Sequence, residues 1–215
     1  MSLLKTTFHF NREYRSLKRL LTIVETAAAY GFQDVAEKIA PINRLRWRRN
    51  RQLASRSRPE KFRMLLEELG PTFVKFGQIL STRPDLVTAT YANELTKLTE
   101  HVEPVSYELV RSVIFNEFGE GPETLFAEFD PEPLAAASIG QVHRATLKDG
   151  TLVVVKVQRP GIRRTIDLDL DLMNYIAGKL EEYSTDFARM QAVRIVGEFA
   201  YSLRRELNYR FEAAN

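Results

Sequence analysis

The sequence predicts an α+β fold, in which a helical half is followed by a small antiparallel sheet and further helices. Three observations predict it. Apolar residues recur at helical spacing through the first half. Two segments rich in small and β-branched residues flank the turn sequence Lys148-Asp149-Gly150, which is typical of a hairpin. Glycines and prolines gather over 119–133 and indicate a boundary between the two halves.

The helical half is divided by residues that start or stop helices. Pro59, Pro71 and Pro84 can each open a helix, because the N–H that proline lacks would be unpaired in the first turn anyway. Gly31 is expected to end the first helix, and Ser106 to cap a later one. The predicted helices span residues 11–30, 34–39, 59–70, 71–81, 84–100, 106–118, 165–183 and 186–215.

The two predicted strands are 134–147 and 151–158, and the second carries one lysine in an apolar run. Alternation along the strand places Lys156 and Val154 on one face and Val155 on the other. A lysine in such a strand costs free energy unless its ammonium finds an anionic partner. Lys156 is therefore either a phosphate-binding lysine or a side chain that reaches solvent from an edge strand.

The composition excludes several functional classes. The 215-residue chain has no cysteine, which excludes disulfide scaffolds, thiol catalysis and cysteine-zinc sites and suits a cytoplasmic location. Its three histidines, His9, His101 and His143, are too scattered to build a metal site, and no metal site is expected. No apolar stretch approaches the ~18 residues of a membrane span, and residues 1–15 lack the apolar core of a signal peptide.

Positive charge is concentrated in residues 44–63, which hold nine basic side chains and one acidic one, although the net charge of the chain is only +3. Such a block is most often a solvated linker or helix face. With Trp47 among its arginines, it also suits an anchor on an anionic membrane surface. Nucleic-acid binding is not expected, because no second basic or aromatic platform accompanies the block.

Two segments carry candidate binding residues besides Lys156. Residues 134–142 read Leu-Ala-Ala-Ala-Ser-Ile-Gly-Gln-Val, and their small side chains would let backbone N–H groups approach an anion. Taken alone, such a run is usually a sign of tight packing. Lys75 and Gln78 share one face of a predicted helix, and Gly77 between them permits close approach of another backbone.

Acidic residues near the C-terminus form two groups. Glu206 and Glu212 would lie about 240° apart on one helix, so they cannot serve one partner; one could pair with Lys156 and the other with Lys75. Otherwise they are ordinary solvated surface glutamates. The alternate aspartates of 167–171 lack the glycine and the final acid of a calcium loop and are expected to form a solvated helix face.

Together these segments resemble the UbiB family, the aarF-domain atypical kinases linked to the biosynthesis of ubiquinone and related isoprenoid quinones. The resemblance runs from Phe62 to Asn215. The order and spacing of its motifs make it specific. The motifs are Lys75–Gln78 with the trailing Ser81–Leu86, Ala135–Arg144, Val155–Gly161 and Glu206–Glu212.

The resemblance implies a protein-kinase-like N-lobe with a helical N-terminal extension and without its C-lobe. The expected divisions are 1–58, amphipathic helices and a basic linker; 59–130, a helical extension with the Lys-Phe-Gly-Gln motif; and 131–215, the N-lobe. In such proteins an alanine-rich turn replaces the glycine-rich loop over ATP. The residues expected to bind ATP are Leu134, Ala135, Ala136, Ala137, Ser138, Ile139, Gly140, Gln141, Val142, Val154 and Lys156.

The resemblance also assigns roles to five residues as the catalytic set. Lys156 matches the lysine that binds the phosphates, and Glu212 matches its ion-pair partner. Lys75 and Gln78 match the family's inserted motif, which covers the site where ordinary kinases admit a peptide, and Glu206 matches the acid that holds this insertion.

The function implied is ATP binding and slow hydrolysis, coupled to small-molecule or lipid-related phosphotransfer in quinone biosynthesis. Expected partners are ATP, an anionic membrane surface, lipid or quinone precursors and proteins of quinone biosynthesis, and the protein is expected at the membrane periphery. The alternative is a non-catalytic module that senses nucleotide or binds membrane lipid.

Two positions depart from the family pattern. Val154 stands where a small residue is usual, and its bulk on the face of Lys156 is expected to crowd adenine. Asn208 stands where an aspartate is usual, so the pairing of Lys75 should be weaker. Metal-binding and catalytic-loop aspartates are missing before Asn215, so Mg²⁺ is expected only with a C-lobe. The chain alone is therefore expected not to hydrolyse ATP, and whether it is an enzyme stays open.

Overall fold

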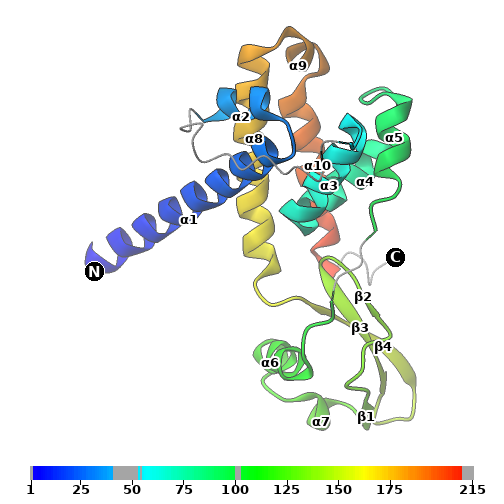
Figure 1. The fold of residues 1–215 in the computed structure, drawn as a ribbon. Helices are drawn as coiled ribbons and strands as arrows, with labels where there is room; N and C mark the ends of the chain where they lie inside the picture. Colours follow the sequence, from blue (N-terminus) through cyan, green and yellow to red (C-terminus); the bar gives the residue numbers. More distant parts are fainter. Residues whose placement is uncertain (1, 41–52, 54, 100–102, 210–215) are drawn as a thin grey trace. The chain divides into compact units, whose positions relative to one another are not determined.

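The computed structural model describes residues 2–40, 53, 55–99 and 103–209 (Figure 1). Side chains are described from residue 13 onward. The chain divides into two compact units. The first comprises 1–98 and 166–215 and has helices as the only regular elements of its described part, while the second, 99–165, contains all the described strands. The predicted α+β class, with helices before and after a small sheet, is confirmed.

The first unit is built by packing the apolar faces of its helices. Val24 and Ala28 of the first helix pack against Ala36 and Ile39 of the second, and all four are buried. None of the described helices is long and apolar enough to cross a bilayer. The helices are α1 Ser2–Ala29, α2 Gln33–Ile39, α3 Arg58–Leu69, α4 Pro71–Ser81, α5 Ala89–Leu95, α8 Ile162–Tyr183, α9 Thr185–Met190 and α10 Ala192–Glu206.

The helix predicted over 84–100 begins later than expected. Pro84 lies in a turn, because the Arg83 guanidinium binds the Asp85 carboxylate through Nη2 at 2.8 Å and Leu86 N–H donates to the Arg83 carbonyl. Helix α5 starts only at Ala89. Pro84 therefore lies within a turn and does not open the helix.

The single helix predicted over 186–215 is also broken. Gln191 has a left-handed backbone with φ 54°, so it separates α9 from α10. Helix α10 ends at Glu206, after which Asn208 N–H donates to the Arg205 carbonyl in a tightened last turn. The predicted placement of Glu206 and Glu212 on one continuous helix is wrong, and Glu212 itself lies outside the described residues.

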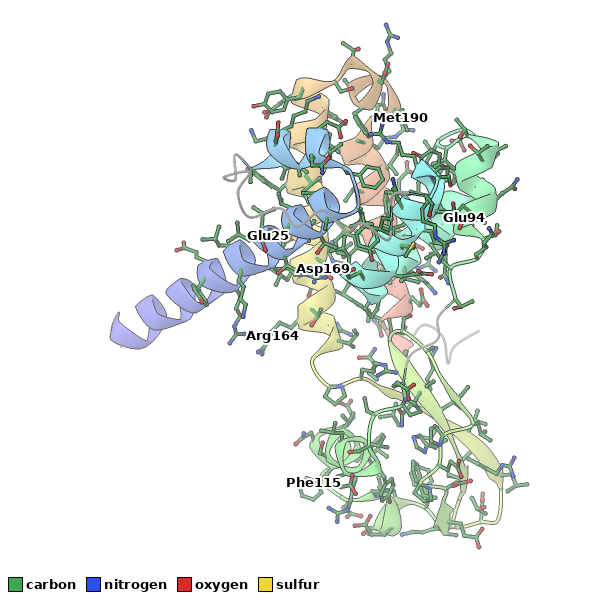
Figure 2. The ribbon with its side chains drawn as sticks, in the orientation of Figure 1. Glu25, Glu94, Phe115, Arg164, Asp169 and Met190 are labelled. Atoms are coloured by element: carbon green, nitrogen blue, oxygen red, sulfur yellow. The ribbon has the colours of Figure 1, made fainter. Side chains whose placement is uncertain are left out.

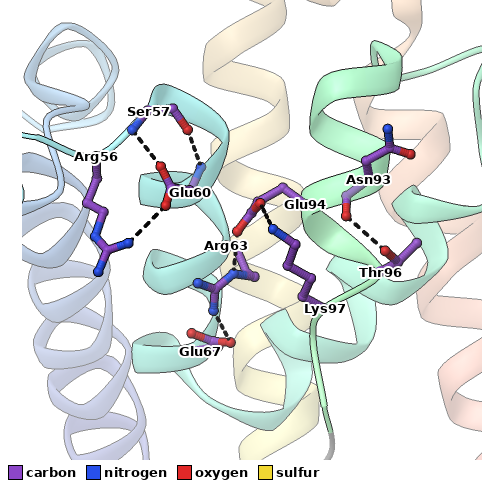
Figure 3. Close-up of polar contacts among 9 residues, drawn as sticks. All are labelled: Arg56, Ser57, Glu60, Arg63, Glu67, Asn93, Glu94, Thr96 and Lys97. Carbon is purple, nitrogen blue, oxygen red and sulfur yellow. Dashed lines mark hydrogen bonds and ion pairs between the residues drawn. The ribbon is translucent and has the colours of Figure 1, made fainter.

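Helix α3 starts with a capping box that the proline argument missed. The Ser57 hydroxyl accepts from Glu60 N–H, and the Glu60 carboxylate accepts from Ser57 N–H at 2.9 Å (Figure 3). These bonds, with Arg56, lower the pKa of Glu60 to about 2. Further along, Arg63 donates through Nε to Glu94 at 2.8 Å, which joins α3 to α5 (Figure 3).

A buried ion pair joins the first helix to α8. Asp169, labelled in Figure 2, is 1% exposed. Its carboxylate accepts from Arg19 Nε at 2.7 Å and Nη2 at 3.1 Å. Arg19 also donates to the Leu69 carbonyl and lies 5.6 Å from the ring centre of Phe73. The prediction of a solvated aspartate face at 167–171 is thus wrong for Asp169, because an arginine distant in sequence compensates its burial.

The second unit is a four-stranded antiparallel sheet with two helices, α6 Tyr107–Phe118 and α7 Pro122–Leu125. Strand β3 Gly140–Thr146 is central and pairs with all three others. The predicted Asp-Gly hairpin is present between β3 and β4. The other strands are β1 Glu128–Phe129, β2 Ala135–Ala136 and β4 Leu152–Gln158.

The strand predicted over 134–147 is two strands instead of one. The chain reverses at 137–139, so β2 folds back on β3 with Ala135 opposite Val142 and Ala136 opposite Gln141. Small residues suit a tight reversal as well as a strand, which is why the sequence pattern did not reveal the break. The alanine-rich segment is therefore a hairpin. Its reversal, residues 137–139 (Ala-Ser-Ile), is called the alanine-rich turn after the segment to which it belongs.

Helix α6 packs on one face of this sheet. Val110 and Ile114 of α6 form a buried cluster with Val157 of β4, and Val155 packs against it. The residues of β4 on this face are buried or half-buried, whereas Lys156 and the two residues that precede it on the opposite face are exposed. The alternation predicted for β4 is therefore confirmed.

Candidate functional site

The face of the β3–β4 hairpin opposite α6 carries the lysine that the sequence singled out. Lys156 is paired in register with Val142, and Val154 is paired with Arg144. Paired residues of an antiparallel ladder share a face, so the two cationic and two aliphatic side chains form one surface. Val154 is 68% exposed and Leu152, next on this face, is 74% exposed. We call this surface the exposed hairpin face.

The alanine-rich turn adjoins this face, because β2 pairs with β3 at Val142. The turn is closed by Ala137 N–H, which donates to the Gly140 carbonyl at 2.8 Å. Ser138 and Ile139 are 2% and 4% exposed, so both side chains point into the unit. The Ser138 hydroxyl finds no hydrogen-bond partner among the described residues, an arrangement that costs free energy in a closed turn.

The exposed hairpin face combines aliphatic side chains with positive charge, and nucleotide binding by this face stays a prediction. Exposed aliphatic side chains offer an apolar surface to a base, and Lys156 and Arg144 offer positive charge to phosphates. In the alanine-rich turn, the side chain of Ala137 is small and those of Ser138 and Ile139 are buried. Within the described ranges, no group of three histidine, aspartate or glutamate side chains is placed to hold a metal ion.

The opposite face of the hairpin holds a closed hydrogen-bond network. Gln141 is buried, and its amide accepts from Val105 N–H at 2.8 Å and donates to the Val105 carbonyl at 3.3 Å. Its nitrogen also lies 2.9 Å from His143 Nε2, while His143 Nδ1 donates to the Asp130 carbonyl at 2.8 Å. The side chain of Gln141, predicted to bind the cofactor, is therefore engaged on the face under α6.

In the first unit, the predicted pairing of Lys75 with a glutamate is present. Lys75 Nζ lies 2.8 Å from Glu206 Oε1, which joins α4 to α10. The aromatic rings of Phe76 and Phe199 meet edge to face with centres 5.2 Å apart in the same interface. Asn208 lies two residues after the end of α10, and the Lys75–Glu206 distance is short although an asparagine stands there. The catalytic roles of these residues stay a prediction.

Gly77 and Gln78 hold α4 against the segment that follows α5. Gln78 Nε2 donates to the Leu98 carbonyl at 3.2 Å. A Cβ built on Gly77 would lie 2.4 Å from a Leu98 methyl carbon and 2.6 Å from one of Leu66. Gly77 thus admits two leucine side chains, whereas the sequence predicted the approach of a backbone.

We expect Gly77→Ala to lower the free energy of unfolding by about 1–2 kcal/mol, because overpacking outweighs the helix propensity that alanine gains. Gly197→Ala is the matched control, since a Cβ on this helical glycine meets no atom within 4 Å. The control should instead raise stability by about 0.5–1 kcal/mol. Urea unfolding followed by circular dichroism measures both, and equal effects of the two variants would refute this packing argument.

The remaining predicted site residues are placed as follows. Leu134 is exposed and its N–H donates to the Val142 carbonyl, so it continues the β2–β3 hairpin. Ala135 and Ala136 form β2, and Gly140 begins β3. Glu212 and Trp47 lie outside the described residues, as does half of the basic block 44–63. The predicted Lys156–Glu212 pair therefore stays a prediction.

A scan against protein-family models matches residues 97–215 to the ABC1 atypical kinase-like domain. The chain belongs to the ABC1 atypical kinase-like family. This family assignment agrees with the four-stranded antiparallel sheet and the helices of the structure. It confirms the resemblance on which the sequence interpretation rested.

Curated members of the ABC1 family share the sequence well beyond these motifs. A protein named "Probable protein kinase UbiB" from Marinobacter nauticus is 48% identical over 74% of this chain and 29% of its own length. A protein of the same name from Shewanella woodyi is 38% identical over 93% of this chain and 38% of its own length. The chain thus spans about a third of the length of these relatives.

One solved structure, the Rv3197–erythromycin complex from Mycobacterium tuberculosis, is 34% identical with a TM-score of 0.45, and the match covers 70% of this chain and 38% of that chain.

Two structurally important arginines of this ABC1 chain were missed by sequence reasoning. Arg19 forms the buried pair with Asp169, but the two residues are 150 positions apart, so no local pattern links them. Arg159 follows β4 and binds two backbone carbonyls, at Ala137 and Glu103. An arginine directly after a strand carries no signal of such a role in one sequence.

Proposed function

We propose that this chain is the ATP-binding part of an atypical kinase-like protein that supports the biosynthesis of ubiquinone or a related isoprenoid quinone. The observation that carries the proposal is the exposed hairpin face, where Lys156 stands beside aliphatic side chains and next to the alanine-rich turn. Membership of the ABC1 family supports a nucleotide as the ligand of this face, and the names of the relatives support the quinone pathway.

The roles of the residues follow from their chemistry. Lys156 supplies a positive charge on a rigid strand, where it binds and orients phosphate oxygens. Val142, on the same face, packs against the base and excludes water from it, whereas the bulk of Val154 limits the room for the base. The alanine-rich turn presents backbone close to the phosphates because its side chains are small or turned inward. Mg²⁺, when bound with the nucleotide, would neutralise phosphate charge, and we expect its ligands in a C-lobe.

Val154 decides how much room a base has on this face. Its side chain is exposed and opposite Arg144, so it extends the apolar surface. A side chain larger than alanine at this position leaves less room for a purine on the exposed hairpin face. We therefore expect ATP to bind more weakly than it would to a Val154→Ala variant.

A membrane role rests on the basic block. Residues 44–63 carry nine basic side chains with Trp47 among them, which suits anionic headgroups. We propose that the protein works at the membrane periphery on lipid or quinone precursors, in contact with other proteins of quinone biosynthesis. In the alternative function, the same block binds lipid in a non-catalytic module that only senses nucleotide or has lost nucleotide binding.

Calorimetric titration of the full-length protein with ATP tests the proposal, with vesicle co-sedimentation in parallel. We expect saturable ATP binding, and stronger binding to vesicles with anionic lipid than to purely zwitterionic ones. Indifference to ATP together with retained binding to anionic vesicles would favour the non-catalytic lipid-binding module. The 215-residue chain alone should release no phosphate from ATP, and sustained magnesium-dependent release from it would contradict this part of the proposal.

A further inference from the structure

The end of strand β4 and the alanine-rich turn are joined by one side chain. Arg159 Nε donates to the Ala137 carbonyl at 3.0 Å, and its Nη2 donates to the Glu103 carbonyl at 2.7 Å. Its own backbone N–H donates to the Ile139 carbonyl at 3.0 Å. Arg159 therefore binds both ends of the turn and fixes it to the segment before α6.

From these contacts we infer that Arg159 is a positioning residue, which holds the alanine-rich turn in the shape that receives the nucleotide without itself touching it. The inference rests on the proposed ATP-binding function. Guanidinium suits the task because its planar fork directs two N–H donors in fixed directions, one to each carbonyl. A lysine offers one ammonium and cannot make both bonds in the same geometry.

The turn needs such support because its own interactions are few. One backbone hydrogen bond, from Ala137 N–H to the Gly140 carbonyl, closes it. At its centre the buried Ser138 hydroxyl is without a partner among the described residues, which disfavours the closed shape. Charge-assisted bonds from Arg159 offset that cost.

The surroundings of Arg159 agree with a role in holding the turn rather than in contacting the nucleotide. The side chain is half-buried, and burial lowers the pKa of its guanidinium. A second connection lies on the face under α6. There Gln141, at the start of β3, and Val105 bind each other by two hydrogen bonds. Arg159 thus joins the alanine-rich turn to Glu103, and Gln141 joins the start of β3 to Val105, two residues further along the same segment. A turn fixed before ligand arrives loses less conformational entropy on binding.

Nucleotide affinity and amide exchange of Arg159→Met and Arg159→Lys in the full-length protein test this inference. We expect Arg159→Met to weaken ATP binding by about tenfold or more, and Arg159→Lys to recover part of the loss. Hydrogen exchange without nucleotide should be faster at 137–140 in Arg159→Met. Arg164→Met is the control, because Arg164 is exposed at the start of α8 (Figure 2), and it should bind ATP as wild type does.

The outcomes separate this inference from the proposed function. Unchanged affinity in Arg159→Met, with wild-type binding intact, would overturn the inference alone. Weaker binding without faster exchange at the turn would also overturn it, because Arg159 would then act by touching the nucleotide. A wild-type protein that binds no ATP would remove the proposed function, and the positioning role would fall with it. Thermal unfolding of each variant identifies any global loss of the fold. If Arg159→Met does not fold, the ATP affinity and the amide exchange of Arg159→Lys, which keeps the charge, decide the question.

Discussion

Asp169→Asn should destabilise the helical unit by about 3 kcal/mol, the lower end of the range for breaking a buried ion pair. The Asp169 carboxylate is 1% exposed and takes two hydrogen bonds from Arg19. Asparagine keeps the shape and one acceptor oxygen, but it removes the charge that compensates the guanidinium. The lower end applies because Arg19 keeps its bond to the Leu69 carbonyl and is 23% exposed.

Asp167→Asn is the matched control for this variant. Asp167 lies two residues earlier on α8, and its contact with Arg204 is long, at 3.4 Å, and about half exposed on both sides. Exposed pairs of this kind contribute about 0–1 kcal/mol. Urea unfolding of both variants, with Arg19→Met added to complete a double-mutant cycle, measures the difference. Equal destabilisation by Asp167→Asn and Asp169→Asn would show that the Arg19–Asp169 pair does not hold the helices together.

Lys156→Met should weaken ATP binding to the full-length protein by roughly ten- to a hundredfold, equivalent to about 1.5–3 kcal/mol for bonds to a charged group. Lys156 lies on the exposed hairpin face, opposite Val142 and beside the alanine-rich turn. Methionine has a similar length and no charge, so it preserves the packing of the strand. The fold should be unaffected, because the side chain is exposed.

The sequence predicted those parts of the fold that depend on local signals. Helix α4 spans Pro71–Ser81 as expected, since proline opens it. The Asp149-Gly150 turn and the alternation in β4 are also as predicted. In each case the deciding residues are neighbours in the chain.

Where the sequence interpretation was wrong, the deciding contact was distant or ambiguous. Asp169 looked solvated because Arg19, 150 residues away, is invisible to a local pattern. The break at Gln191 depends on a left-handed backbone conformation, which a glutamine in the sequence does not indicate. Small residues at 135–139 predicted one strand, whereas they form a strand and a turn.

The candidate site was predictable in its residues but not in its supports. The motif resemblance identified Lys156, Lys75 and Glu206, and the last two meet at 2.8 Å. It gave no sign that Gln141 faces away from the exposed hairpin face, or that Arg159 fixes the turn. Supporting hydrogen bonds to backbone carbonyls leave no pattern in one sequence, because any residue supplies the acceptor.

The dissociation constant for ATP of the wild-type protein, set beside those of Lys156→Met and Lys148→Met, tests the nucleotide site most directly. Lys148 is exposed in the β3–β4 turn, so its variant controls for a general loss of positive charge. The exposed hairpin face predicts weakened binding for Lys156→Met and wild-type binding for Lys148→Met. Equal affinity of the wild type and Lys156→Met would contradict the assignment of this face as the ATP site.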